Sequence, residues 1–212
     1  MIRVLVADDQ TLVRRGLCLL FEPEPDLEVV GEAGDGDEAV RLADRLVPDV
    51  ILMDLRMPGV DGITATRRII RSRPSAQVLA VTTFDDDSHL YPALEAGVSG
   101  FVTKDTPPPA LLDAVRKAAD GDQAFSRGVL ARLVERASAT PRPAPAGLPP
   151  TLTAREHEVL ALVTEGLSNR EIAERLSVSI TTIKTHVAAL MTKTGCPNRI
   201  TLAVLADRAA RP

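Results

Sequence analysis

The sequence is poor in cysteine and aromatic residues and contains no long apolar run. Its two cysteines, Cys18 and Cys196, form neither a metal-binding spacing nor a disulfide framework. The longest apolar runs, such as Val159 to Val163, have five residues, whereas a membrane-spanning helix needs about 18 or more. Acidic residues already stand at Asp8 and Asp9, which excludes a secretory leader. These absences predict a cytoplasmic protein that does not enter the membrane.

The composition nevertheless supports folded domains. Hydrophobic residues make up 45% of the 212 residues, which is ample for packed cores and excludes wholesale disorder. A chain of this length favours one large domain or two small ones. The aromatic residues are four Phe and one Tyr, without Trp, and this scarcity disfavours a pocket for a large flat cofactor.

One proline-rich segment divides the chain. Ser138 to Pro150 reads SATPRPAPAGLPP, and its five prolines predict an extended, semi-rigid spacer. Residues 1–120 carry a net charge of −8, whereas residues 121–150 and residues 151–212 each carry +2. We therefore predict a domain at 1–120, a helical extension with a proline-rich linker at 121–150, and a small domain at 151–212. The charge difference reflects either an ordinary acidic face or a second domain that approaches a polyanion.

Short apolar runs alternate with helical patterns in the first 120 residues. Faces such as Leu12, Leu17 and Leu20 indicate helices between the runs. This alternation predicts an α/β domain with a doubly wound, five-stranded parallel sheet covered on both faces. Pro92 lies where one of the helices is expected, so that helix should start late or kink. The five predicted strands are Ile2 to Ala7, Val29 to Val30, Val50 to Met53, Val78 to Val81, and Phe101 to Val102.

Polar side chains stand at the ends of these predicted strands. Asp8 and Asp9 follow the first strand, Asp54 the third, Thr82 the fourth and Lys104 the fifth. The carboxyl ends of parallel strands meet at one edge of the sheet. Three carboxylates brought together repel one another, and Mg²⁺ with its oxygen ligands is the natural compensation. Asp54 is then a nucleophile toward a phosphoryl group, while Lys104 and Thr82 bind the transferring oxygens.

Each of these residues also has a simpler interpretation. An Asp-Asp pair after a strand often serves only as a helix N-cap, and Lys104 or Thr82 alone is an ordinary residue. The joint pattern favours a site, because each residue stands at its own strand end. A phosphatase of the haloacid-dehalogenase kind is an enzyme alternative, but that chemistry wants a second Asp two residues after the nucleophile. This chain has Arg56 there, which counts against it.

Four motifs resemble those of a two-component receiver domain. They are VLVADD at 4–9, VILMDLRMPGVDG at 50–62, VTTF at 81–84 and GFVTK at 100–104. The resemblance covers residues 1 to about 120 and implies a flavodoxin-like fold with Mg²⁺ as cofactor.

The resemblance also assigns roles to single residues. It implies that Asp54 is the phosphoacceptor, that Asp9 binds Mg²⁺ directly and that Asp8 does so through water. Asp54 and the backbone carbonyl of Arg56 complete the protein's metal ligands. The resemblance further implies that Thr82 and Lys104 stabilise the phosphoryl group and that Thr82 and Phe101 are the switch residues.

The helical patterns in the second half of the sequence predict a small all-α domain. Thr153 to Glu156 and Ser168 to Glu171 are capping boxes that open two helices. A third helix runs from about Ile180 to Thr194, and a last one from about Ile200 to Arg208. Two helices joined by a short turn fit a DNA-reading helix-turn-helix. On periodicity alone, a four-helix interaction module is an equal contender.

Motifs in this half resemble the LuxR-type DNA-binding domain. They are LTAREHEVL at 152–160, GLSNREIA at 166–173 and TIKTHV at 182–187. Together the two halves resemble a response regulator of the NarL/FixJ family. The resemblance implies base contacts for Lys184 and Thr185 and backbone contacts for Thr182 and His186. It also places Ala188, where relatives often have a polar or basic residue, on the recognition helix.

The implied function is that of a transcription regulator switched by phosphorylation. The chain is not expected to be an enzyme, except that it takes up its own phosphoryl group from a donor and later loses it. The implied partners are a sensor histidine kinase, a double-stranded DNA operator and a second copy of the chain after phosphorylation. The alternative is a LuxR-type regulator that senses a small molecule without phosphorylation. That alternative shares the second half, but its sensing domain needs an enclosed ligand pocket in place of polar strand ends.

Overall fold

The chain forms two compact units in a computed structural model that describes residues 1–82, 87–125, 148–149 and 151–210. The first unit comprises Met1–Ala119 and Gln123–Ser126, and the second comprises Asp120–Asp122 and Arg127–Pro212. Of the predicted extension and linker at 121–150, the structure describes residues 121–125 and 148–149, and Ala124–Phe125 form a short strand in place of a helix. The rest of the extension and linker lies outside the described residues. Within the described residues, no helix has the length and apolar character needed to cross a membrane.

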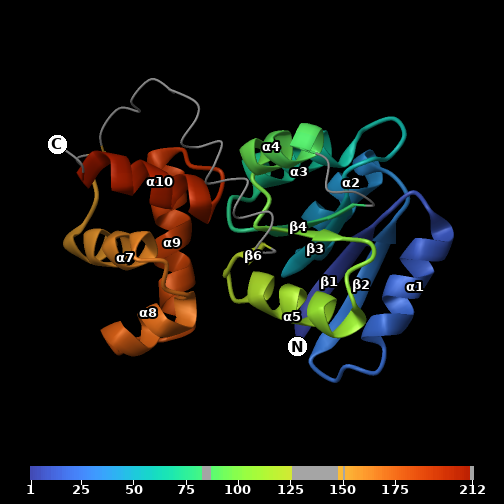
Figure 1. Ribbon diagram of the computed structural model, residues 1–212, viewed down its shortest axis with the longest axis horizontal. Helices are drawn as coiled ribbons and strands as arrows, with labels where there is room; N and C mark the ends of the chain where they lie inside the picture. Colours follow the sequence, from blue (N-terminus) through green and yellow to red (C-terminus); the bar gives the residue numbers. More distant parts are fainter. Residues whose placement is uncertain (83–86, 126–147, 150, 211–212) are drawn as a thin grey trace. The chain divides into compact units, whose positions relative to one another are not determined.

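The first unit is built on a parallel sheet with the strand order β2-β1-β3-β4-β5-β6. Five helices connect and cover the strands (Figure 1). The strands are β1 (Ile2–Ala7), β2 (Leu27–Ala33), β3 (Val50–Asp54), β4 (Gln77–Thr82), β5 (Gly100–Thr103) and β6 (Ala124–Phe125). The helices are α1 (Thr11–Phe21), α2 (Gly36–Leu46), α3 (Gly62–Ser72), α4 (Asp87–Ala96) and α5 (Pro108–Ala119).

The predicted α/β class is confirmed, but the predicted number of five strands is wrong. The sixth strand, β6, has two residues and pairs with β5 through Gly100 opposite Ala124 and Phe101 opposite Phe125. So short a strand leaves no periodic pattern in the sequence. The strand β2 is also longer than the predicted Val29 to Val30, because an edge strand carries polar and glycine residues that hide its extent.

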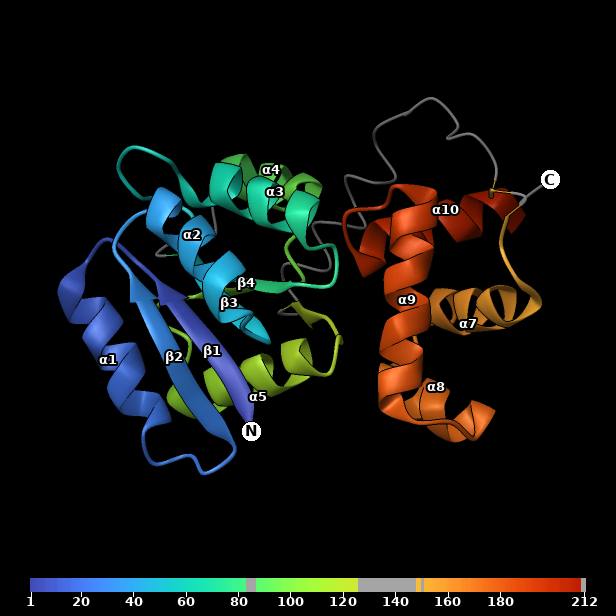
Figure 2. The ribbon, with the colours of Figure 1, turned by 180° about the vertical axis from the view of Figure 1, so that it is seen from behind.

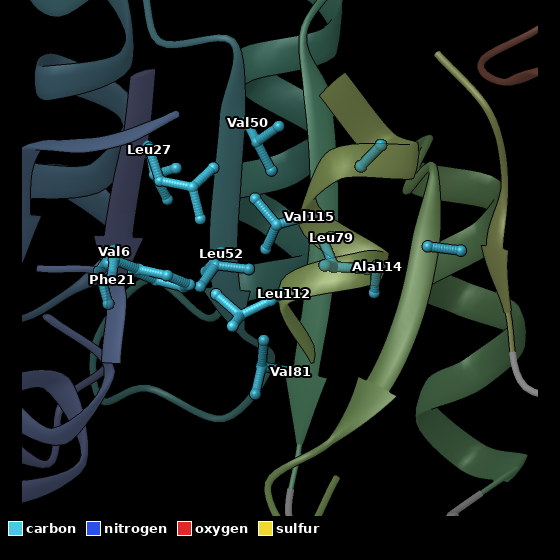
Figure 3. Close-up of a cluster of buried hydrophobic side chains, with 13 residues drawn as sticks. Val6, Phe21, Leu27, Val50, Leu52, Leu79, Val81, Leu112, Ala114 and Val115 are labelled. Atoms are coloured by element: carbon cyan, nitrogen blue, oxygen red, sulfur yellow. The ribbon is translucent and has the colours of Figure 1, made fainter. Parts of the chain in front are cut away.

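Helices cover both faces of the sheet. Figures 1 and 2 show α1 and α5 on one face and α2, α3 and α4 on the other. Figure 3 shows the core between the sheet and the α1–α5 layer, where Phe21 of α1 and Leu112 and Val115 of α5 pack on strand residues such as Leu52. Burying this core fixes the strands in register and therefore fixes where their ends lie.

The helix α4 passes through a proline. Pro92 lies inside the helix, between Asp87 and Ala96, so the proline does not delay the start of the helix. The apolar side chains Leu90, Ala93 and Leu94 of the helix are buried. Packing of this kind outweighs the hydrogen bond that a proline cannot donate.

The second unit is all-helical. Its helices are α7 (Ala154–Thr164), α8 (Asn169–Leu176), α9 (Ile180–Thr194) and α10 (Arg199–Ala210). Both predicted capping boxes are formed, at Thr153 with Glu156 and at Ser168 with Glu171. Ser177, in the left-handed conformation with φ of 52°, ends α8 and turns the chain toward α9. Buried residues from all four helices, among them Val163, Ile172 and Leu190, form one core.

Candidate functional site

Three charged side chains meet at the carboxyl ends of β1, β3 and β5. The ammonium nitrogen Nζ of Lys104 lies 2.6 Å from Asp8 Oδ2 and 2.8 Å from Asp54 Oδ2. The side chains of Asp8 and Asp54 are 2% and 5% exposed, and that of Lys104 is 11% exposed. The pairing of β1 with β3, β3 with β4 and β4 with β5 brings these ends to one edge of the sheet. We refer to this cluster, together with Asp9, as the acidic pocket.

Asp9 adds a third carboxylate to the acidic pocket. One carboxylate oxygen from each of Asp8, Asp9 and Asp54 lies within 4.8 Å of the others, and Asp9 is exposed whereas the other two are buried. The described pocket thus holds three carboxylates and one ammonium group, that of Lys104, which pairs with Asp8 and Asp54. A hard divalent cation with oxygen ligands fits this donor set, because it offsets the excess negative charge.

Burial and charge shift the pKa values in the pocket. Burial raises the pKa of Asp54, and hydrogen bonds from Lys104 and from the Arg56 backbone N–H reverse only part of that rise. Burial lowers the pKa of Lys104, but its hydrogen bond to Asp54 and its ion pair with Asp8 outweigh burial and raise the pKa overall. Lys104 is therefore firmly protonated, while the Asp54 carboxylate is incompletely stabilised.

The remaining predicted pocket residues lie close by. The backbone N–H of Arg56 donates to Asp54 Oδ1 at 3.1 Å, and the Arg56 side chain is exposed. Thr82 is buried at the end of β4, and its carbonyl accepts a hydrogen bond of 2.7 Å from the Lys104 backbone N–H. Phe101 is 1% exposed on β5, beside Ala80 of β4. The fold thus places all of these residues at or next to the same sheet edge.

The loop after β3 requires a glycine at position 62, where its backbone lies against the backbone of Asp54. A Cβ atom on Gly62 would lie 1.9 Å from the Asp54 carbonyl oxygen, so no other residue fits without displacing the backbone. The Gly62 N–H donates to the Leu55 carbonyl at 3.1 Å, and Asp61 caps α3 by accepting from the Thr64 N–H. These contacts fix the backbone on which Asp54 and Arg56 stand.

Two residues that hold Asp8 were missed by the sequence analysis. The Gln10 N–H donates to Asp8 Oδ1 at 2.8 Å, and Arg14 Nη1 donates to the Asp8 carbonyl at 2.6 Å. Their one signal in the sequence is a position shortly after the Asp-Asp pair, and that position equally suits ordinary residues in the first turn of a helix. Only the folded structure shows that these two residues hold Asp8.

In the second unit, α9 carries the predicted DNA-contacting residues. Thr185 is exposed, and the side chain of Lys184 is 41% exposed. Thr182 and His186 are half-buried, as is Ala188. The opposite face of α9 is buried in the core of the unit. The outward face therefore presents a short polar surface in which Lys184 supplies the positive charge.

Both ends of α9 are anchored. At its start, Ser179 caps the helix by accepting from the Thr182 N–H, and the two hydroxyl oxygens lie 2.8 Å apart. At its end, Lys193 Nζ donates to Glu156 Oε2 at 2.8 Å, which ties α9 to the capping box of α7. The hydrogen bond from Lys193, together with those from Thr153, lowers the pKa of Glu156 to about 2.

Both units match known protein families. Residues 4–116 match the family model of the response regulator receiver domain, and residues 150–206 match that of the bacterial regulatory proteins of the luxR family. The transcriptional regulatory protein LiaR of Bacillus subtilis (strain 168) is 43% identical over 209 residues, which cover 98% of this chain and 98% of LiaR.

Solved structures resemble the chain over its full length. The crystal structure of ChrA, a response regulator of a heme-sensing two-component system, has 37% sequence identity and a TM-score of 0.54, covering 98% of this chain and 96% of ChrA. A structure of two RcsB dimers bound to two parallel DNAs has 29% identity and a TM-score of 0.56, covering 99% of each chain. The chain described here therefore belongs to the NarL/FixJ family of response regulators, which join a receiver domain to a LuxR-type helix-turn-helix domain.

Proposed function

We propose that the chain is a cytoplasmic transcription regulator that a sensor histidine kinase switches by transferring a phosphoryl group to Asp54. The observation that carries this proposal is the acidic pocket, in which Lys104 bridges Asp8 and Asp54 and Asp9 lies within reach of both. This pocket belongs to a chain whose other unit is a helix-turn-helix domain. We propose residues 1–120 as the receiver domain and residues 151–212 as the DNA-binding domain, with the extension and linker between them.

Asp54 acts as the nucleophile in the proposed reaction. One of its carboxylate oxygens attacks the phosphorus of the phosphorylated kinase histidine, so that an O–P bond forms and the N–P bond breaks. The raised pKa of Asp54 indicates a carboxylate whose negative charge is incompletely offset, which suits an attacking group. Lys104 lies 2.8 Å from Asp54 Oδ2 and offsets charge on the transferring oxygens, while Thr82 donates a hydrogen bond to one of them.

Mg²⁺ is the proposed cofactor of the acidic pocket. Asp8, Asp9, Asp54 and the backbone carbonyl of Arg56 would hold it, Asp8 through water. When bound, it supplies positive charge that offsets the carboxylates and the phosphoryl oxygens. The excess of carboxylates over ammonium groups in the described pocket is the observation that supports this assignment.

Thr82 and Phe101 are the proposed switch. Thr82 is buried at the end of β4, and Phe101 is buried on the neighbouring strand β5, three residues before Lys104. A change at the phosphoryl group that moves the Thr82 hydroxyl would therefore reach the Phe101 ring through adjacent strands. The two residues link the pocket chemistry to the shape of the β4–β5 region.

The recognition helix α9 reads an operator in double-stranded DNA. Lys184 and Thr185 contact base edges, and Thr182 and His186 contact the sugar-phosphate backbone, with Ala188 farther along the helix. Residues 151–212 carry 8 basic and 6 acidic residues, so a single copy makes few phosphate contacts. We propose that phosphorylation promotes a homodimer, as in the RcsB dimers that were solved on DNA, because two linked copies gain effective concentration.

Incubation with acetyl phosphate and Mg²⁺, followed by intact mass measurement, tests the proposal. We expect one hydroxylamine-sensitive phosphoryl group on the parent chain and none on the Asp54→Asn variant, whose neutral side chain has the same shape. Asp113→Asn, the same substitution at an exposed position of α5, serves as the control and should label normally. Undiminished labelling of Asp54→Asn would overturn the assignment. Sedimentation with and without acetyl phosphate tests the dimer, which identical monomer fractions would refute.

A further inference from the structure

The backbone of Asp8 accepts a hydrogen bond from a side chain that is not part of the acidic pocket. Arg14, on the first turn of α1, donates from Nη1 to the Asp8 carbonyl at 2.6 Å. Its Nε donates to Glu32 Oε2 of β2 at 3.2 Å. The Arg14 side chain is only 16% exposed. One guanidinium group therefore links α1 to the end of β1 and to the neighbouring strand β2.

Every polar atom of Asp8 has a close partner. Its N–H donates to the Ala33 carbonyl at 3.1 Å, and its carbonyl accepts from Arg14. Its Oδ1 accepts from the Gln10 N–H, and its Oδ2 lies 2.6 Å from Lys104 Nζ. The carbonyl contact differs from the other three, because that oxygen belongs to the peptide unit that joins Asp8 to Asp9.

Asp9 depends on this peptide unit for its position. Within the described part of the chain, its carboxylate has no hydrogen bond or ion pair that would orient it, and the residue is exposed. The peptide unit is planar, so fixing the Asp8 carbonyl also fixes the direction in which the chain continues to the Asp9 Cα atom. We propose that Arg14 is a positioning residue that holds Asp9 in place as a ligand for a divalent cation. This inference rests on the proposed function, since it concerns the proposed Mg²⁺ site.

The sign of the effect separates positioning from simple electrostatics. Removing the positive charge of Arg14 should by itself tighten the binding of a cation nearby, because like charges repel. A positioning role predicts the opposite, since a misplaced Asp9 loses affinity. Partners that orient metal ligands typically change metal affinity by about 10–100-fold.

Arg15 offers a matched control on the same helix. Its Nη1 lies 3.2 Å from the other oxygen of Glu32, Oε1, and its side chain is 69% exposed. Arg15→Gln removes the same charge and an ion pair with the same partner, whereas Arg14→Gln also removes the hydrogen bond to the Asp8 carbonyl. Apart from a longer contact of Arg14 Nη2 with Thr11 Oγ1 at 3.5 Å, the difference between the two variants reports that hydrogen bond.

The experiment is calorimetric titration of the full-length chain with Mg²⁺ alone, below the melting temperature of each variant. We expect Arg14→Gln to weaken Mg²⁺ binding about 10-fold or more and Arg15→Gln to stay within about twofold of the parent. Arg14→Lys keeps the charge but not the two-pronged geometry, so it should be intermediate. This variant also provides the measurement if Arg14→Gln does not fold.

Three results would contradict this expectation, and they do so differently. If the parent binds Mg²⁺ and Arg14→Gln binds it equally well or more tightly, the positioning role is overturned and the proposed function stands. Equal weakening in both variants also overturns it, because Glu32 or net charge would then be the cause. If the parent itself binds no Mg²⁺, the proposed metal site fails.

Discussion

The acidic pocket and the recognition helix α9 handle charge in opposite ways. The pocket buries an ammonium group 11% exposed between two carboxylates that are 2% and 5% exposed, and its residues come from separate strands. The helix presents Lys184, 41% exposed, on one continuous element. Buried charges depend on one another, because water cannot replace a missing partner, whereas water can replace the partner of an exposed charge. Substitutions should therefore abolish function in the pocket and only reduce it on the helix.

The largest effect is expected for Lys104→Met. The substitution removes the ammonium group that pairs with Asp8 and Asp54 and that offsets charge on the transferring oxygens. The rate of labelling by acetyl phosphate should therefore fall about 100-fold or more. Lys117→Met, on the exposed face of α5, is the control and should keep the parent rate. A loss of less than about threefold would show that Lys104 is not part of the chemistry. Time courses at saturating Mg²⁺ provide the measurement.

A smaller effect, on DNA affinity, is expected for Lys184→Ala. A base contact predicts a loss of about 1–3 kcal/mol at the operator and a relaxed preference at one base pair. A phosphate contact predicts even weakening on all sequences and a salt slope smaller by about one unit. We expect the base contact, because Lys184 lies near the start of the helix, where residues enter the groove. Affinities for operator and scrambled DNA at several salt concentrations distinguish these, and unchanged affinities throughout would exclude α9 as the reader.

The ion pair of Lys193 with Glu156, which joins α9 to α7, should contribute to stability in a pH-dependent way. Glu156 has a pKa of about 2 in the fold against an ordinary value of 4.5, because Lys193 and Thr153 donate hydrogen bonds to it. Its contribution is therefore present above pH 4.5 and disappears as the pH falls toward about 2. Glu156→Gln should lower the melting temperature by a few degrees at pH 7, and the gap should close in acid. Glu158→Gln, at an exposed ion pair, should show little change at any pH.

The smallest effect concerns the stability of Asp54→Asn without Mg²⁺. The raised pKa of Asp54 means that the fold favours its protonated form, so the carboxylate destabilises the fold at neutral pH. The neutral variant should be at least as stable as the parent at pH 7. The difference should shrink as the pH falls toward the raised pKa and the parent takes up a proton. Urea unfolding in EDTA at pH 7 and pH 5 measures it, and a clearly less stable variant at pH 7 would contradict this view.

The two regions also differ in how far the sequence predicts them. Asp8, Asp54 and Lys104 were predicted together because apolar runs identify strands and parallel strands share one carboxyl edge. The capping boxes of α7 and α8 were equally visible, because a cap is a local pattern of Ser or Thr followed by Glu.

What the sequence could not predict depends on contacts between distant elements. The strand β6 has two residues and exists only because β5 offers it an edge. The contact of Arg14 with the Asp8 carbonyl requires α1 to lie against the ends of β1 and β2, and no spacing rule encodes that geometry. The continuation of α4 through Pro92 likewise depends on packing, which overrides a local preference.

The parallel topology of the first unit also sets a schedule for synthesis. Asp54 and Lys104 are 50 residues apart, so at about 5–20 residues per second a ribosome takes roughly 3–10 s to travel from one codon to the other. Throughout that interval the nascent chain carries Asp8 and Asp54 without the ammonium group of Lys104 that later pairs with both. On the proposed function, a growing chain lacks part of its phosphoryl-accepting pocket until β5 has joined the sheet, so the order of the strands disfavours activation of an unfinished regulator.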